Sequence, residues 1–253
     1  MKKIAVLQSN YIPWKGYFDI IASVDEFIIY DQVQYTKNDW RNRNKIKTAH
    51  GLSWLTIPVK NQGLTQKISE TMVIENGWQK KHWQSIRHAY TKAPFFKLYQ
   101  AAFEEIYMSI EISDLSKINL NFLKAICKLL NINTIISNSE DYLFSGNRVE
   151  KLINLVKAAG GTHYLSGQAA KSYIEESVFI QSGIQLEWMT YEGYPEYPQL
   201  YPPFEHKVTV LDLLFNAGDE ASKFMLFQSA NSEIAILPKI LSEPAQPISD
   251  IIF

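Results

Sequence analysis

The sequence predicts an α/β protein with a mainly parallel sheet, an N-terminal βαβ unit and a helical insertion. Two short apolar segments, 4–7 and 26–30, flank a helical segment over 16–22, which is the order of a βαβ unit. From about 78 to 131 the apolar residues recur at helical spacing. A second alternation of strands and helices follows over 134–189. The pattern favours a mainly parallel sheet that is interrupted by helices.

The βαβ unit determines which polar residues become neighbours. Its crossover is right-handed and its strands are parallel, so both strands end at the same edge of the sheet. Gln8, Ser9 and Asn10 follow the first strand, and Asp31 ends the second. We therefore expect a ligand crevice at the carboxyl edge of the sheet.

The remaining elements are expected in chain order. Residues 35–48 have no clear apolar period and are interpreted as an ordered functional loop or a short helix. Then come a strand over 54–59, the helical block, a strand over 134–137, a helix over 148–157 that stops at Gly160-Gly161 and a strand over 162–165. They are followed by a helix from Gln168 toward Tyr173, a strand over 185–189, an irregular Tyr- and Pro-rich segment over 191–203, and a helix over 208–217, after which Asp219 is expected to cap a final helix.

Composition narrows the class of protein. With 46% hydrophobic and 20% charged residues, residues 1–253 are expected to form a single globular domain with the insertion at about 78–131. A net charge of −1, from 25 basic and 26 acidic residues, argues against a general nucleic-acid binder. Only Cys127 is present, in an apolar run, so we expect a buried helix residue and a reducing compartment. No signal peptide or membrane-length apolar run is found, which predicts a cytoplasmic protein without membrane insertion.

Cationic and aromatic residues cluster at 40–43. Arg41 and Arg43 can offer bidentate forks to a phosphate, while Trp40 offers a flat surface to a base or sugar and Asn42 adds an amide. A solvated run of charges is the alternative. Near the first strand, Gln8 to Tyr11 and the amides leading to Gly16 can bind a ligand at a helix N-terminus, or serve only in capping and turns.

Three further positions carry possible chemistry. Asp31 suits a ribose hydroxyl or an amine, although a surface Asp at a strand end is an equal alternative. Ser166 begins a strand-to-helix turn and fits either an anion nest or a plain N-cap. His206, beside Glu205, can act as a general acid or base for an amine nucleophile. The spacing of the histidines predicts no metal site.

Several long motifs resemble the WbqC-like protein family over nearly the whole chain. These motifs are residues 8–18 (QSNYIPWKGYF), 30–35 (YDQVQY), 40–46 (WRNRNKI), 164–167 (YLSG), 197–199 (YPQ) and 211–216 (LDLLFN). The family occurs in bacteria among genes for O-antigen and other surface polysaccharides. The resemblance implies a transferase that attaches an aminoacyl group of the glycyl type, or a similar acyl group, to the amine of a nucleotide-linked amino sugar.

This reading assigns a role to each candidate residue. Asp31 or His206 would take the proton from the amine. The substrate-binding residues would be Gln8, Ser9, Asn10, Tyr11, Lys15, Gly16, Tyr17, Trp40, Arg41, Asn42, Arg43, Ser166, Tyr197 and Gln199. The activated acyl donor would be an aminoacyl-tRNA, a carrier thioester, or an adenylate made from ATP and Mg²⁺, and the sequence does not choose among them.

Two other functions stay open. The chain loosely resembles nucleotidylyltransferases, whose His-x-Gly-His tetrad would correspond to Trp14-Lys15-Gly16-Tyr17, with both His positions replaced. That likeness favours an adenylate-forming or nucleotidyl-transferring enzyme. The other function is a non-catalytic module that binds a nucleotide-sugar or glycan and scaffolds neighbouring enzymes. In that module only the aromatic and basic residues would matter.

Overall fold

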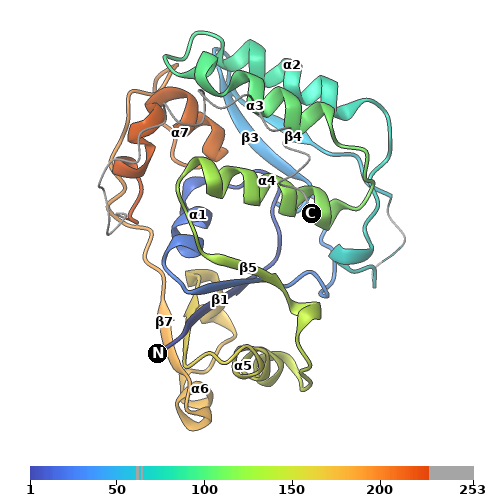
Figure 1. Ribbon diagram of the computed structural model, residues 1–253, viewed down its shortest axis with the longest axis vertical. Helices are drawn as coiled ribbons and strands as arrows, with labels where there is room; N and C mark the ends of the chain where they lie inside the picture. The colour runs from blue at the N-terminus through green and yellow to red at the C-terminus, as the bar shows by residue number, and fades with distance from the viewer. Residues whose placement is uncertain (61–62, 64, 228–253) are drawn as a thin grey trace.

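Five parallel strands form the central sheet of the computed structural model, which describes residues 1–60, 63 and 65–227 (Figure 1). The strand order is β5-β2-β1-β6-β7, and each neighbouring pair is parallel. The strands are β1 (Lys3–Leu7), β2 (Glu26–Ile29), β5 (Ile135–Asn138), β6 (His163–Ser166) and β7 (Gln185–Trp188). The predicted α/β class with a mainly parallel sheet is therefore confirmed.

The chain changes direction across the sheet at β1. It runs outward from β1 through β2 to β5, then returns to the other side of β1 for β6 and β7. Helix α1 (Lys15–Ala22) connects β1 to β2, which confirms the N-terminal βαβ unit. The topological switch point consequently lies between β1 and β6, where sheets of this type open a crevice at the carboxyl ends of their strands.

Alternate residues of the strands enter two cores on opposite faces of the sheet. Ala5 and Phe27 join the larger core, with helix α1 and helix α4 (Leu115–Leu129). Ile4 and Ile28 join the smaller core, with helices α5 (Arg148–Ala158) and α6 (Glu176–Ser182). Figure 1 shows these helices on either side of the sheet. Burial on both faces explains the apolar runs of the central strands β1 and β2.

The predicted helical block is confirmed as three helices whose apolar residues form part of the larger core. They are α2 (Trp78–Tyr90), α3 (Phe96–Met108) and α4. Helix α7 (Val210–Ala217) joins them through Phe215, whose ring lies 5.2 Å from that of Tyr90 and 5.1 Å from that of Phe96. This apolar cluster holds the C-terminal part of the described chain against the insertion.

A β-hairpin occupies the segment that was expected to be a loop or short helix. Strands β3 (Arg43–Thr48) and β4 (Gly51–Thr56) pair antiparallel, so the prediction is wrong over 43–48, and β4 begins earlier than the predicted strand at 54. The inward positions of β3 are Asn44 and Ile46, which are 3% and 1% exposed. A buried Asn on the inner face hides the alternation that identifies a strand.

Smaller differences concern short elements. The helix expected from Gln168 toward Tyr173 is a 3-10 segment over Gln168–Ser172 (η3), and α6 was not predicted. A 3-10 segment over Gly218–Phe224 (η4) contains Asp219, so that residue does not cap a final helix. Two further 3-10 turns are η1 (Ile68–Glu70) and η2 (Ser139–Asp141). The Pro-rich stretch over 191–203 contains no helix or strand, as predicted.

The described residues include no helix that is both long enough and apolar enough to span a membrane. Cys127 is 4% exposed within α4, which confirms the expectation of a buried helix residue.

Candidate functional site

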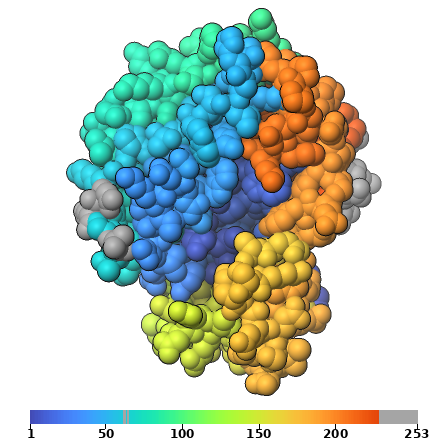
Figure 2. Space-filling view, turned by 180° about the vertical axis from the view of Figure 1, so that it is seen from behind, coloured from blue at the N-terminus to red at the C-terminus, as the bar shows by residue number. Residues whose placement is uncertain are grey.

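The candidate site lies at the switch point of the sheet, outside the carboxyl ends of β1 and β6. Ser9 and Asn10 follow β1, and Gly167 follows β6. In Figure 2 the N-terminal segment, in dark blue, forms the floor of a hollow between the lighter blue and the orange segments. The arrangement matches the crevice that the βαβ unit predicts.

A cavity of about 180 Å³ opens beside the loop that follows β1. Its lining combines two indole rings, two amide side chains, a proline ring and an ammonium group. The lining residues are Asn10, Pro13, Trp14, Trp40, Asn44 and Lys207. An apolar wall with a few polar groups is typical of a small-molecule site.

The loop after β1 is held in an unusual backbone conformation. Ile12 has a φ of 34°, which is rare for a β-branched residue. The Nδ2 atom of Asn44 donates hydrogen bonds to the carbonyl oxygens of Tyr11 (3.1 Å) and Ile12 (2.7 Å), and the Tyr11 N–H donates to the Trp40 carbonyl (3.0 Å). The hairpin thus fixes the cavity floor.

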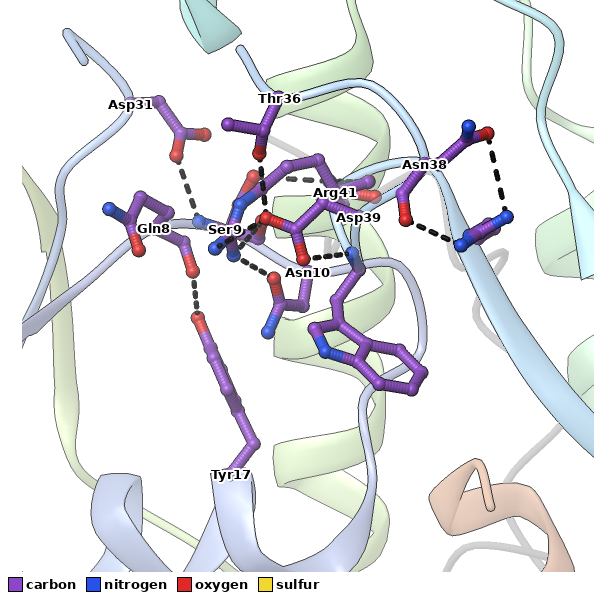
Figure 3. A network of polar contacts seen from close by, with 12 residues as sticks. Gln8, Ser9, Asn10, Tyr17, Asp31, Thr36, Asn38, Asp39 and Arg41 are labelled. Atoms are coloured by element: carbon purple, nitrogen blue, oxygen red, sulfur yellow. Dashed lines mark hydrogen bonds and ion pairs between the residues drawn. The ribbon is translucent and has the colours of Figure 1, made fainter. Parts of the chain in front are cut away.

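Asp31 binds the same loop through the Ser9 N–H (Figure 3). Its Oδ1 accepts a hydrogen bond from the Ser9 N–H at 2.8 Å, and its Oδ2 accepts one from the Ser116 hydroxyl of α4. The residue is 4% exposed. Both carboxylate oxygens therefore already have partners within the protein, and the residue positions the loop.

Arg41 closes the other side of this network. It donates to the Ser9 carbonyl (3.4 Å) and to Oδ1 of Asn10, and it pairs with Asp39 at 3.7 Å, as Figure 3 shows. Burial of Asp39 raises its pKa, but hydrogen bonds from Thr36 and the Trp40 N–H, together with Arg41, outweigh it and hold the pKa below the usual value. Arg41 thus shapes the wall of the cavity through Asn10.

Arg43 and Asn42 point in different directions. Asn42 is 6% exposed, and its Nδ2 donates to the Ile57 carbonyl at 2.8 Å. The Arg43 guanidinium lies 4.2 Å from the ring centroid of Trp54 and donates to Asn38. Alternation along β3 separates the two, so Arg43 reaches the outward face of the hairpin.

Lys15 is buried at the start of α1 and fastens two distant segments. Its Nζ donates to the carbonyls of Phe224 (2.9 Å) and Pro195 (3.3 Å). Burial lowers the pKa of Lys15 to about 8. The predicted phosphate contact would require this amine to leave its carbonyl partners.

Gly16 and Tyr17 support the cavity wall from below. A Cβ at Gly16 would lie 2.4 Å from the Trp14 ring, so the absent side chain lets the indole lie against α1. The Tyr17 hydroxyl donates to the Gln8 carbonyl at 2.8 Å (Figure 3). Both residues set the positions of atoms at the end of β1.

The irregular segment over 191–203, the Tyr-rich loop, reaches the cavity only through its contacts with Trp14. The rings of Tyr191 and Tyr194 lie 5.3 Å and 5.7 Å from that of Trp14. The Tyr194 hydroxyl also donates to the buried Asp19 carboxylate. The loop therefore packs against Trp14, and the cavity lining contains none of its residues.

His206 lies beside the Tyr-rich loop and directly before Lys207, which lines the cavity. Its ring lies 6.3 Å from that of Tyr194 and 4.6 Å from that of Phe204. Partial burial and the nearby Lys15 charge lower the pKa of His206 below its ordinary value. Its buried Nδ1 has no hydrogen-bond partner among the residues that the structure describes.

Four further predicted residues have hydrogen-bond partners within the protein or are buried. Tyr197 is 5% exposed, and its hydroxyl donates to Oδ1 of the buried Asp212 at 2.6 Å. Gln199 donates to the same oxygen at 2.6 Å. Tyr11 is fully buried, and Ser166 is 2% exposed at the end of β6. The fold buries Tyr11, Ser166 and Tyr197, whereas Gln199 is partly exposed.

The structure thus brings Asn10 and Trp40 together around one cavity, with the Tyr-rich loop packed against Trp14. It adds Pro13, Trp14, Asn44 and Lys207, which the sequence interpretation did not place in the binding set. Their signal was present, because Pro13 and Trp14 lie inside the first motif and Asn44 lies inside the 40–46 motif. Trp14 occupies the position directly before a helix, where Ser, Thr, Asp or Asn usually caps the helix. A Trp at that position indicates a role for the side chain other than capping.

The fold defines a doubly wound α/β protein with a crevice at its switch point. A family model for the WbqC-like protein family matches residues 8–224. The chain belongs to the WbqC-like protein family.

One relative extends this similarity along almost the whole of both chains. The uncharacterized protein Rv1507c of Mycobacterium tuberculosis (strain ATCC 25618 / H37Rv) is 47% identical over 228 residues, covering 90% of this chain and 99% of that protein. No solved structure matches the chain significantly. The looser likeness to nucleotidylyltransferases therefore remains a prediction.

Proposed function

We propose that this protein transfers an acyl group, of the aminoacyl type, to the amine of a nucleotide-linked amino sugar during surface polysaccharide biosynthesis. The lining of the cavity carries this proposal. Trp14 and Trp40 can cover the apolar face of a sugar ring, Asn10 can bond a hydroxyl, and Lys207 can balance a phosphate charge. Membership of the WbqC-like family supports a biosynthetic enzyme.

The proposed reaction forms an amide bond between the sugar nitrogen and the acyl carbon. The bond from that carbon to its activating group breaks, and the leaving group takes the electron pair. The amine proton passes to His206, whose lowered pKa keeps the imidazole neutral at pH 7. Asp31, the other predicted base, positions the loop in this proposal because both of its oxygens are hydrogen-bonded.

Direct transfer from the donor agrees with the protonation state of the Cys127 thiol. Burial raises the pKa of Cys127 to about 12, so its thiol is protonated at neutral pH and does not serve as an acyl carrier. The activated donor is an aminoacyl-tRNA, a carrier thioester or an adenylate made from ATP and Mg²⁺.

The test supplies the purified protein with a UDP-linked amino sugar and each donor class carrying glycine. The expected result is a product heavier by one glycyl residue, absent when the sugar amine is already acetylated. His206→Asn should lower kcat by about 100-fold or more with a similar KM. The control is His163→Asn, on β6, which should leave kcat unchanged.

A non-catalytic binding scaffold is the second candidate. It is favoured by one observation, the use of both Asp31 oxygens inside the protein. Binding of the nucleotide-sugar without product from any donor class would support the scaffold over the transferase.

A further inference from the structure

We propose that the outward face of the β3–β4 hairpin is a subsite for the nucleoside diphosphate part of a substrate. The base would stack on Trp54, and the diphosphate would lie on Arg43 and Lys45. The inference rests on the proposed function for the sugar that follows the diphosphate, and it extends that function to Trp54 and Lys45, which lie outside the cavity lining.

The strand register places the three side chains on one face. Lys45 pairs with Trp54 and Arg43 with Thr56, and directly opposed residues of an antiparallel pair share a face. The intervening residues Asn44 and Leu55 are buried against the protein. Arg43, Lys45 and Trp54 are therefore presented on the side of the hairpin that faces away from the core.

The two exposed indole rings lie next to each other, and two cations lie over the ring of Trp54. Trp40 and Trp54 are 42% and 43% exposed, and their ring centroids are 5.7 Å apart. The Arg43 guanidinium lies 4.2 Å and the Lys45 ammonium 4.9 Å from the centroid of Trp54. Aromatic rings bordered by cations bind nucleotides by stacking on the base and neutralising the phosphate.

Within the described part of the chain, only one carboxylate is known to affect the two cations of this face. Asp39 interacts electrostatically with Arg43 without forming a salt bridge to it. Among the described residues, no salt bridge involves Arg43 or Lys45. The buried Nε of Arg43 has no hydrogen-bond partner in the same part of the chain. A guanidinium and an ammonium side by side complement the two phosphates of a nucleoside diphosphate.

The face is continuous with the cavity through Trp40. That indole lines the cavity and also contacts Trp54. A single ligand can therefore place its sugar in the cavity of about 180 Å³ and its base on the hairpin. Two exposed indoles and two cations match one nucleotide, and the net charge of −1 does not favour a long nucleic acid.

The test is calorimetric titration of the full chain with UDP. Trp54→Ala should weaken UDP binding by about tenfold or more, and Trp54→Phe should restore most of it. The matched control is Leu52→Ala, because Leu52 lies on the same face of β4 and is also 43% exposed. The control should bind UDP like the unchanged protein.

A second variant separates the phosphate contacts from stacking. Lys45→Gln should weaken UDP binding while leaving the weaker binding of uridine unchanged. No UDP binding by the unchanged protein, equal affinities of the Trp54 and Leu52 variants, or tighter binding of single-stranded RNA than of UDP would each overturn the subsite.

The proposed function fails in a different way from this inference. If UDP binds through Trp54 but no acylated sugar forms, the subsite stands and the transferase does not. If Trp54→Ala makes product with an unchanged KM for the nucleotide-sugar, the transferase stands and the subsite is overturned.

Discussion

The loop network around Asp31 and the outward face of the β3–β4 hairpin contain similar residue types but use them differently. In the network, the carboxylate of Asp31 and the guanidinium of Arg41 bond to backbone and side-chain atoms of the protein. On the hairpin face, Arg43 and Trp54 lie against each other beside solvent. Residue type alone therefore does not separate a group that holds the fold from one that is available to a ligand.

The position along the strand explains the difference between the two arginines. Arg41 precedes β3 and its side chain, 13% exposed, reaches back to the loop after β1. Arg43 begins β3 and points away from the core. Substitutions can test whether the loop network around Asp31 contributes to stability and the outward face of the hairpin to binding.

The largest expected effect is the loss of Asp31. Asp31→Ala leaves the Ser9 N–H and the Ser116 hydroxyl without their acceptor, which should lower the free energy of unfolding by about 4 kcal/mol. Urea denaturation measures this change. Asp39→Ala is the control, because its side chain is 33% exposed, and it should cost about 1 kcal/mol. Equal costs would remove the distinction between the network and its exposed rim.

The second largest effect is expected at acidic pH, where protonation of His82 should lower the free energy of unfolding. The Nε2 atom of His82 faces the Thr56 carbonyl, so this nitrogen carries the proton. The Nδ1 atom accepts a hydrogen bond from the Tyr11 hydroxyl at 2.8 Å. Burial lowers the pKa of His82 from 6.5 to about 4.

The direction of the change in stability with pH follows from proton binding. Between pH 6.5 and about pH 4, His82 is protonated in the unfolded chain and neutral in the folded protein. The contribution of His82 to stability is therefore fully present above pH 6.5 and falls as the pH drops toward 4. The expected loss is about 3 kcal/mol. Denaturation at a series of pH values measures it, and His82→Gln should flatten the profile over this window. A profile unchanged by the substitution would contradict the assignment.

The two arginines give the next comparison. Arg41→Ala should lower the free energy of unfolding by about 2 kcal/mol, because Ser9 and Asn10 lose a charged donor. Arg43→Ala should change it by about 0.5 kcal/mol or less and weaken UDP binding instead. Thermal unfolding and calorimetry on the same samples separate the effects. A reversed ranking would place the ligand on Arg41.

The smallest expected stability effect is at Trp40. Because this indole is 42% exposed, Trp40→Ala should cost about 1 kcal/mol or less, measured by urea denaturation. Binding of the nucleotide-sugar should nevertheless weaken by about tenfold, since the ring lines the cavity. Trp78→Ala, at 2% exposure, is the buried counterpart and should destabilise the protein by about 4 kcal/mol.

The centre of the sheet was predictable because β1 and β2 are short, mainly apolar and buried on both faces. The segments at Ile4 and Phe27 could be identified without knowing their partners. The hairpin was not recognised, because the inward Asn44 satisfies the carbonyls of Tyr11 and Ile12. That need arises in a loop more than thirty residues away and leaves no local pattern.

The sequence by itself determined the α/β class, the βαβ unit, the helical block and the polar carboxyl edge of the sheet. Hydrophobic periodicity and strand-end residues are local properties, so they can be read along the chain. The tertiary structure decided which polar residues remain available, by giving Asp31, Lys15 and Gln199 partners within the protein. It also brought Trp14, Trp40 and Lys207 around one cavity. Such pairings depend on contacts between distant segments, and only the folded chain specifies them.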